Sequence, residues 1–156
     1  MKRQQLLFLA SAFCVLVFFP VPASACGCIP SIEALTGGSP KKLVLAEKRR
    51  STAVFSGKVL SINSSRNAYL AVRFKVERTW KHADSVEITV FTTASDSECG
   101  YSFEVGQTYL VYASAPIAGE LWTNHCTRTG RIAIDVAEDL RILGRGRAPK
   151  WASVKR

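Results

Sequence analysis

Histidine is scarce in this sequence of 156 residues, which contains only His82 and His125. A nucleophilic hydrolase needs a base and an orienting group beside its nucleophile, and neither histidine lies in a recognisable catalytic motif. Paired carboxylates are also few, with Asp96 and Glu98 close together in a predicted loop. We therefore do not expect an enzyme.

A phosphate-binding loop is also missing. Gly37 and Gly38 are followed by Ser39 and Pro40 rather than by a lysine that opens a helix. The chain shows no internal repeat, so it is expected to form a single domain after any targeting segment is removed.

Long hydrophobic runs are absent except at residues 6–21. That run follows two basic residues and precedes Ala23-Ser24-Ala25, which is the layout of a secretory signal peptide cleaved after Ala25. It is about 16 residues long and contains Pro20, whereas a membrane-spanning helix needs about 20 residues. We therefore predict that residues 1–25 are a cleaved signal peptide and that the protein is secreted or periplasmic.

Acidic residues are outnumbered by basic ones, 12 against 21. Removal of the two basic residues of the signal peptide lowers the formal net charge from +9 to +7. We expect this charge chiefly to keep the protein soluble, although it also suits contact with an anionic glycan or lipid surface. An exported protein meets such surfaces rather than nucleic acid, so no nucleic-acid partner is predicted.

Four cysteines remain after Cys14 leaves with the signal peptide: Cys26, Cys28, Cys99 and Cys126. An even number of cysteines in an exported protein predicts two disulfide bonds. A bond between Cys26 and Cys28 would close a very tight ring. Both remaining pairings tie the amino terminus to the two distant cysteines.

Zinc is the alternative use of these cysteines, with Cys28, His125 and Cys126 joined by Cys26 or Cys99 as ligands. These residues are separated by one residue or none, whereas structural zinc sites use longer spacings. We therefore expect disulfide bonds, no intrinsic metal ion and no cofactor.

Five segments are predicted as β-strands from alternating or continuous apolar residues: residues 53–62, 69–80, 86–91, 108–113 and 121–123. Gly57 lies inside the first and predicts a strand bent by a bulge. Arg73 and Lys75 flank Phe74, and cations beside an aromatic residue are one way in which a barrel binds single-stranded nucleic acid. The alternation instead places Phe74 in the core and both cations in water. These strands predict a mainly β domain, either a small barrel or a sandwich.

Helices are predicted on both sides of the strands, over residues 32–35, 40–50 and 132–143. Residues 145–156 are predicted to form a basic, frayed tail. Asn63-Ser64-Ser65 matches the N-glycosylation pattern in a predicted loop, which matters only in a eukaryotic secretory pathway.

The cysteine frame resembles the inhibitory amino-terminal domain of the tissue inhibitors of metalloproteinases, within the wider netrin-like group. It consists of Cys26-Gly27-Cys28 at the predicted mature terminus, Cys99-Gly100 before a Gly-x-x-Tyr-Leu strand, and the late Cys126. The resemblance implies a five-stranded OB-fold-like closed barrel over residues 26–144, with flanking helices. It also implies that Cys26 pairs with Cys99 and Cys28 with Cys126.

In that family the processed terminal cysteine lies against the active-site zinc of a protease, where its free amine and its carbonyl oxygen replace the catalytic water. The resemblance therefore implies that Cys26 chelates the zinc of a partner metalloprotease. We expect the protein to be a monomer. An α-amino group titrates near neutral pH, so it has a neutral fraction that can donate a lone pair. The implied contact residues are Gly27, Cys28, Ile29, Pro30, Ser95, Asp96, Ser97 and Glu98.

The sequence departs from the family at Gly27, where the family usually has a side chain that enters the specificity pocket of the protease. The third disulfide bond of the inhibitory domain and the cysteine-rich carboxy-terminal domain are also missing.

Two other hypotheses use the same features. One is a non-inhibitory OB-fold module of the cell envelope, which binds or adheres through Lys41, Lys42, Arg49 and Arg50. The other is a lipoprotein acylated at Cys26, although Ala23 stands where lipoprotein signals usually carry leucine.

Overall fold

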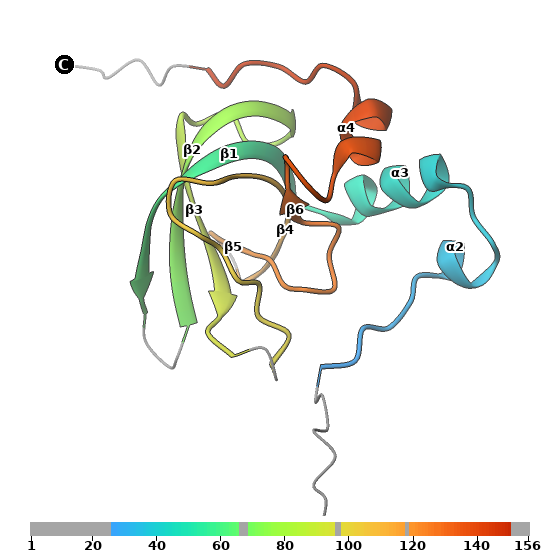
Figure 1. The fold of residues 1–156 in the computed structure, drawn as a ribbon, viewed down its shortest axis with the longest axis horizontal. Helices are drawn as coiled ribbons and strands as arrows, with labels where there is room; N and C mark the ends of the chain where they lie inside the picture. The colour runs from blue at the N-terminus through green and yellow to red at the C-terminus, as the bar shows by residue number, and fades with distance from the viewer. Residues whose placement is uncertain (1–25, 66–68, 96–97, 118, 151–156) are drawn as a thin grey trace, which may run out of the picture.

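The computed structural model describes residues 26–65, 69–95, 98–117 and 119–150, and this part of the protein is mainly β (Figure 1). The predicted signal peptide, two of the predicted contact residues (Asp96 and Ser97) and the end of the basic tail lie outside the described residues. Within the described ranges, no helix is both long enough and apolar enough to cross a membrane.

The strands are β1 (Ala53–Ser64), β2 (Tyr69–Lys81), β3 (Glu87–Thr93), β4 (Thr108–Ile117), β5 (Glu120–Trp122) and β6 (Gly130–Arg131). They form one sheet in the order β1-β2-β3-β5-β4-β6, and β1 also pairs with β4. Five strands are thereby joined in a ring. The pairing of β3 with β5 is parallel, and the other pairings are antiparallel. The five predicted strands are confirmed, whereas the sequence analysis missed β6.

Strand β1 is bent, as Gly57 predicts. Its pairing with β2 shifts register between Ser56 and Gly57 and at two further points. A Cβ at position 57 would lie 2.8 Å from the backbone oxygen of Lys75. Glycine therefore allows the two strands to approach closely where β1 bends to reach both β2 and β4.

Apolar side chains cover both faces of β1 and β4. Phe55 and Val111 point into the ring, where they join Phe74 in the larger buried cluster. Val54 and Leu110 point outward into a second buried cluster. Where both faces are buried, at residues 53–55 of β1 and 109–113 of β4, the sequence is a continuous apolar run. Strand β2 instead alternates, with Arg73 and Lys75 exposed on either side of Phe74. The prediction that Phe74 is a core residue is confirmed.

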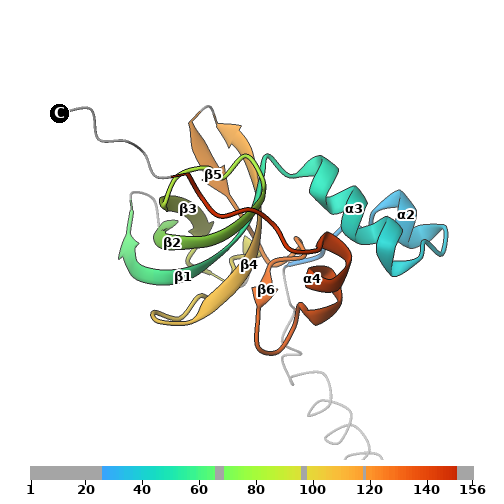
Figure 2. The same ribbon diagram turned by 90° about the horizontal axis from the view of Figure 1, so that it is seen from above.

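The described residues form three helices outside the ring: α2 (Ile32–Leu35), α3 (Pro40–Arg50) and α4 (Ala137–Leu143). Figure 2 shows α4 beside α3 on one side of the ring. Leu140 and Leu143 of α4 pack on the outer buried cluster. The ammonium group of Lys81 in β2 donates hydrogen bonds to the carbonyl oxygens of Lys48 (3.1 Å) and Arg49 (2.8 Å), which fixes the end of α3 to the sheet.

The predicted helix over residues 132–143 is wrong at residues 132–136, because α4 begins at Ala137. Strand β6 pairs with β4, and the N–H of Ile132 donates to the carbonyl oxygen of Thr108 (3.1 Å). The carboxylate of Asp135 accepts a hydrogen bond from the backbone N–H of Arg131 (3.2 Å) and holds a turn before the helix. The sheet and this turn use the backbone groups that a longer helix would need.

The beginning of the basic tail follows the sheet instead of fraying. Arg147 forms an antiparallel bridge with Thr79 of β2, with both N–H···O distances at 2.8 Å. The indole N–H of Trp80 donates to the carbonyl oxygen of Gly144 (3.0 Å). These bonds tie residues 144–147 to β2.

A buried carboxylate connects α4 to the ring. Asp139 is 3 % exposed and accepts hydrogen bonds from the hydroxyl of Tyr112 (2.8 Å) and from Nε and Nη2 of Arg128 (2.8 and 2.5 Å). Burial, followed by the charge and the hydrogen bond of Asp139, raises the pKa of Tyr112, so its hydroxyl remains a donor at neutral pH. Asp139 thus holds α4, β4 and the segment before β6 together.

The substitution Asp139→Asn is expected to lower the free energy of unfolding by about 2 kcal/mol, because it removes the charge that pairs with Arg128. Urea denaturation measures the loss. Glu138→Gln is the matched control, since Glu138 is exposed and its closest ion-pair distance, to Arg141, is 3.8 Å. Equal losses in the two variants would contradict the role assigned to Asp139.

Candidate functional site

Two disulfide bonds hold the segment that begins at Cys26. Cys26 is joined to Cys99 and Cys28 to Cys126, with Cα–Cα distances of 5.0 and 5.2 Å. The prediction of two disulfide bonds is confirmed, and the pairs are those that the family resemblance implies. The bonds link positions separated by 73 and 98 residues, so this short segment is attached to two loops that are far away in the sequence.

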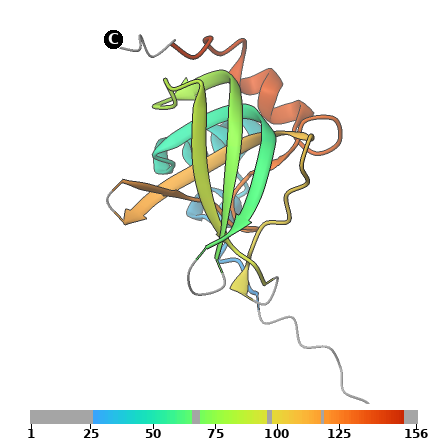
Figure 3. The same cartoon turned by 90° about the vertical axis from the view of Figure 1, so that its left-hand side faces the viewer.

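The two loops that receive the disulfide bonds are themselves joined. Cys99 follows β3, and Cys126 lies between β5 and β6. The N–H of His125 donates to the carbonyl oxygen of Cys99 (2.8 Å), and the N–H of Cys126 donates to Oδ1 of Asn124 (2.9 Å). Figures 1 and 3 place the segment and the loop after β3 at the same end of the ring.

The turn at Cys99 and Gly100 has a geometry that few residues accept. Cys99 has a positive φ of 60°, and the N–H of Gly100 donates to the carbonyl oxygen of Ser95 (3.0 Å). A Cβ at position 100 would overlap the carbonyl oxygen of Thr93. Gly100 is therefore required for the loop to fold back on β3 and present the Cys99 sulfur.

The residues between the disulfide bonds and α2 are exposed. Gly27 has open space around its Cα, and the side chain of Ile29 is 95 % exposed. Cys28 and Pro30 are exposed as well. The segment ends at Ser31, whose hydroxyl accepts a hydrogen bond from the N–H of Ala34 (3.2 Å) and caps α2. Four of the predicted contact residues thus form an extended, accessible segment.

The second predicted contact group is described only at its ends. Ser95 is half-buried and Glu98 is exposed, while Asp96 and Ser97 lie outside the described residues. Glu98 precedes Cys99, which the disulfide bond joins to Cys26. The two predicted contact groups therefore lie next to each other.

The alternative zinc site is incompatible with the disulfide-bonded state. The sulfur atoms of Cys26, Cys28 and Cys126 lie within 4.8 Å of one another, but each is already in a disulfide bond. Zinc binds the thiolate form of cysteine, which these sulfurs cannot adopt while oxidised. Among the described residues, this group of candidate ligands does not include His125.

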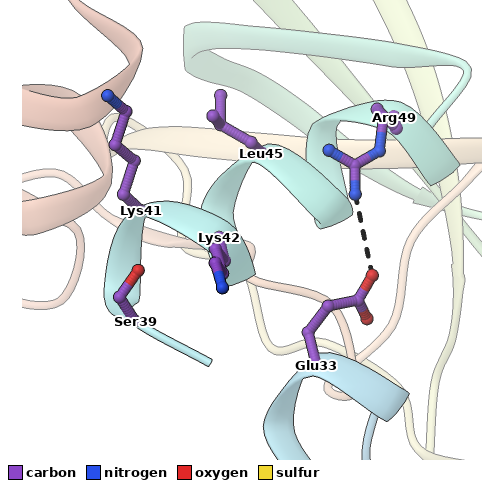
Figure 4. A pocket seen from close by; sticks show the side chains of 6 residues that line it. All are labelled: Glu33, Ser39, Lys41, Lys42, Leu45 and Arg49. Carbon is purple, nitrogen blue, oxygen red and sulfur yellow. Dashed lines mark ion pairs between the residues drawn. The ribbon is translucent and has the colours of Figure 1, made fainter. Parts of the chain in front are cut away.

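A pocket of about 340 Å³ lies between α2 and α3 (Figure 4), lined by Glu33, Ser39, Lys41, Lys42, Leu45 and Arg49. Glu33 forms an ion pair with Arg49 across it, at 3.6 Å. The sequence analysis named the basic residues of α3 but missed the pocket. It is created by the packing of α2 on α3, which no local pattern indicates.

The substitution Gly100→Ala is expected to lower the free energy of unfolding by about 1–3 kcal/mol, because the added methyl group overlaps the backbone of β3. Gly27→Ala is the matched control. Nothing lies within 4 Å of its added methyl group, so its effect should stay within about 0.5 kcal/mol. Urea denaturation of the disulfide-bonded proteins measures both, and an unchanged Gly100→Ala variant would contradict this account of the turn.

Comparison of the chain with models of protein families and with curated proteins finds no match.

Proposed function

We propose that the protein is an exported, single-domain inhibitor of zinc metalloproteases, built on a variant of the OB-fold. The strand order supports this fold, since β1 closes the ring onto β4 and β3 runs parallel to the short β5. An OB-fold is a five-stranded, partly open Greek-key barrel. The helices α2, α3 and α4 flank it.

One observation carries the proposal: the Cys26-Gly27-Cys28 segment is bridged twice and the residues after it are exposed. Cleavage after Ala25 would leave a free amine on Cys26, one bond from the Cα and two from the carbonyl carbon. The amine nitrogen and the carbonyl oxygen would then form a chelating pair. Because the disulfide bonds already hold this pair, binding a metal costs little additional ordering.

In the proposed complex, the free amine and the carbonyl oxygen of Cys26 occupy positions on the zinc of the protease and exclude the water that the zinc would activate. The extended residues from Gly27 to Pro30 lie along the cleft. Ile29 supplies an exposed apolar side chain for it, and the loop that ends at Glu98 contacts the protease beside it.

A form with one extra alanine ahead of Cys26 is expected to inhibit at least about tenfold more weakly than the form that begins at Cys26. The extra residue turns the amine into an amide, whose nitrogen lone pair is delocalised into the carbonyl group and cannot bind the zinc. Residual activity of a panel of zinc proteases, titrated with both disulfide-bonded forms, measures the difference. Equal behaviour of the two forms, or no inhibition by either, contradicts the chelation.

The substitution Gly27→Thr is expected to strengthen inhibition by about tenfold or more, because a side chain then fills a specificity pocket that glycine leaves empty. The threonine fits the free protein, since nothing lies within 4 Å of the Cβ position. The inhibition constant is measured against the same protease panel. Gly27→Ala is the control and should give a smaller gain, whereas no gain from threonine would argue against insertion at this position.

A further inference from the structure

The short helix α2 is not held in place by a buried apolar face. None of the four residues Ile32–Leu35 is buried, and the side chains of Ile32 and Leu35 are 76 % and 71 % exposed. Polar contacts fix the helix instead. The carboxylate of Glu33 lies 3.6 Å from Arg49 and 3.8 Å from Arg50, and the N–H of Gly38 donates to the carbonyl oxygen of Glu33 (2.7 Å). Two large apolar side chains are therefore held in water.

Helix α3, which is paired with α2 through Glu33 and Arg49, has a cationic surface. Lys41 and Lys42 are exposed, and neither forms an ion pair with any residue that the structure describes. Glu33 is the one carboxylate that lines the pocket with Lys41, Lys42 and Arg49. Its pKa lies below the ordinary value, first because it accepts a hydrogen bond from its own backbone N–H and then through Ser31 and the two arginines. Even with Glu33 ionised, the pocket carries net positive charge.

We propose that Ile32 and Leu35 of α2, together with Lys41, Lys42 and Arg49 of α3, form a docking surface for an anionic lipid bilayer. We call these five residues the arm patch. Ile32 and Leu35 enter the interfacial region of the bilayer. Lys41 and Lys42 bind lipid phosphate groups at the mouth of the pocket.

The combination of apolar and cationic groups favours a bilayer over other anionic partners. A bilayer surface offers negative charge and, a few ångströms deeper, apolar chains. A sulfated glycan offers the charge alone and gains nothing from exposed isoleucine and leucine. Two apolar side chains and a few cations provide weak, reversible and salt-sensitive binding rather than permanent anchoring.

The arm patch has a role separate from the proposed protease inhibition, and none of its five residues belongs to the proposed protease contact. Ile29 is left out of the patch because the proposed protease contact uses it. Failure of lipid binding therefore leaves the inhibition untouched, and failure of inhibition leaves lipid binding untouched.

The test is cosedimentation of the disulfide-bonded protein that begins at Cys26 with vesicles of phosphatidylcholine, with and without phosphatidylglycerol. We expect binding to the anionic vesicles that weakens as salt is added. The double variants Ile32→Ser/Leu35→Ser and Lys41→Gln/Lys42→Gln are each expected to lose about tenfold or more in affinity.

Two matched controls separate the patch from general surface properties. Val105→Ser/Ile134→Ser removes apolar side chains that are 61 % and 69 % exposed elsewhere. Lys58→Gln/Lys75→Gln removes the same charge from exposed positions paired across β1 and β2. Both controls should bind like the unchanged protein.

Three results would overturn the arm patch. The first is no binding to the anionic vesicles, and the second is an equal loss in the matched controls. The third is that the protein binds a soluble sulfated polysaccharide but not the vesicles, and that the Ile32→Ser/Leu35→Ser variant binds the polysaccharide equally well. This result would assign the surface to glycans.

Discussion

Residues 26–30 have little buried surface of their own, so their position depends on two covalent bonds. Cys26–Cys99 and Cys28–Cys126 bridge 73 and 98 positions of sequence. In the chain-entropy model, a bridge over a loop of that length stabilises the folded state by about 4 kcal/mol. The ring supplies rigid attachment points for both bridges, because Gly100 and the hydrogen bond from His125 to Cys99 fix the two receiving loops against each other.

The same constraint explains how one small domain presents two kinds of surface. Between and just after the bridged cysteines, the chain is extended and accessible, which suits insertion into a cleft. A few residues later it forms α2, which exposes Ile32 and Leu35 and is paired through Glu33 with Arg49 of the basic helix α3. Lys81 in turn holds the end of α3 to the sheet. Both proposed surfaces thus take their position from the ring rather than from their own packing.

Local patterns predicted much of this fold and failed where tertiary contacts decide. The alternation around Phe74 and the glycine at position 57 correctly indicated a half-buried strand and a bulge, because each depends on immediate neighbours. The start of α4 was misplaced, because residues 130–132 pair with β4 and Asp135 holds a turn that the apolar spacing does not reveal. For the site, the sequence indicated the two disulfide bonds, but the α2–α3 pocket depends on a contact between Glu33 and Arg49 that no periodicity encodes.

The proposed processing and pairing are tested most directly by mass spectrometry of the protein isolated from its host, both intact and after digestion without reduction. We expect a chain that begins at Cys26 and contains the peptide pairs Cys26–Cys99 and Cys28–Cys126. A different first residue, a lipid on Cys26, the exchanged pairing or four free thiols would contradict it.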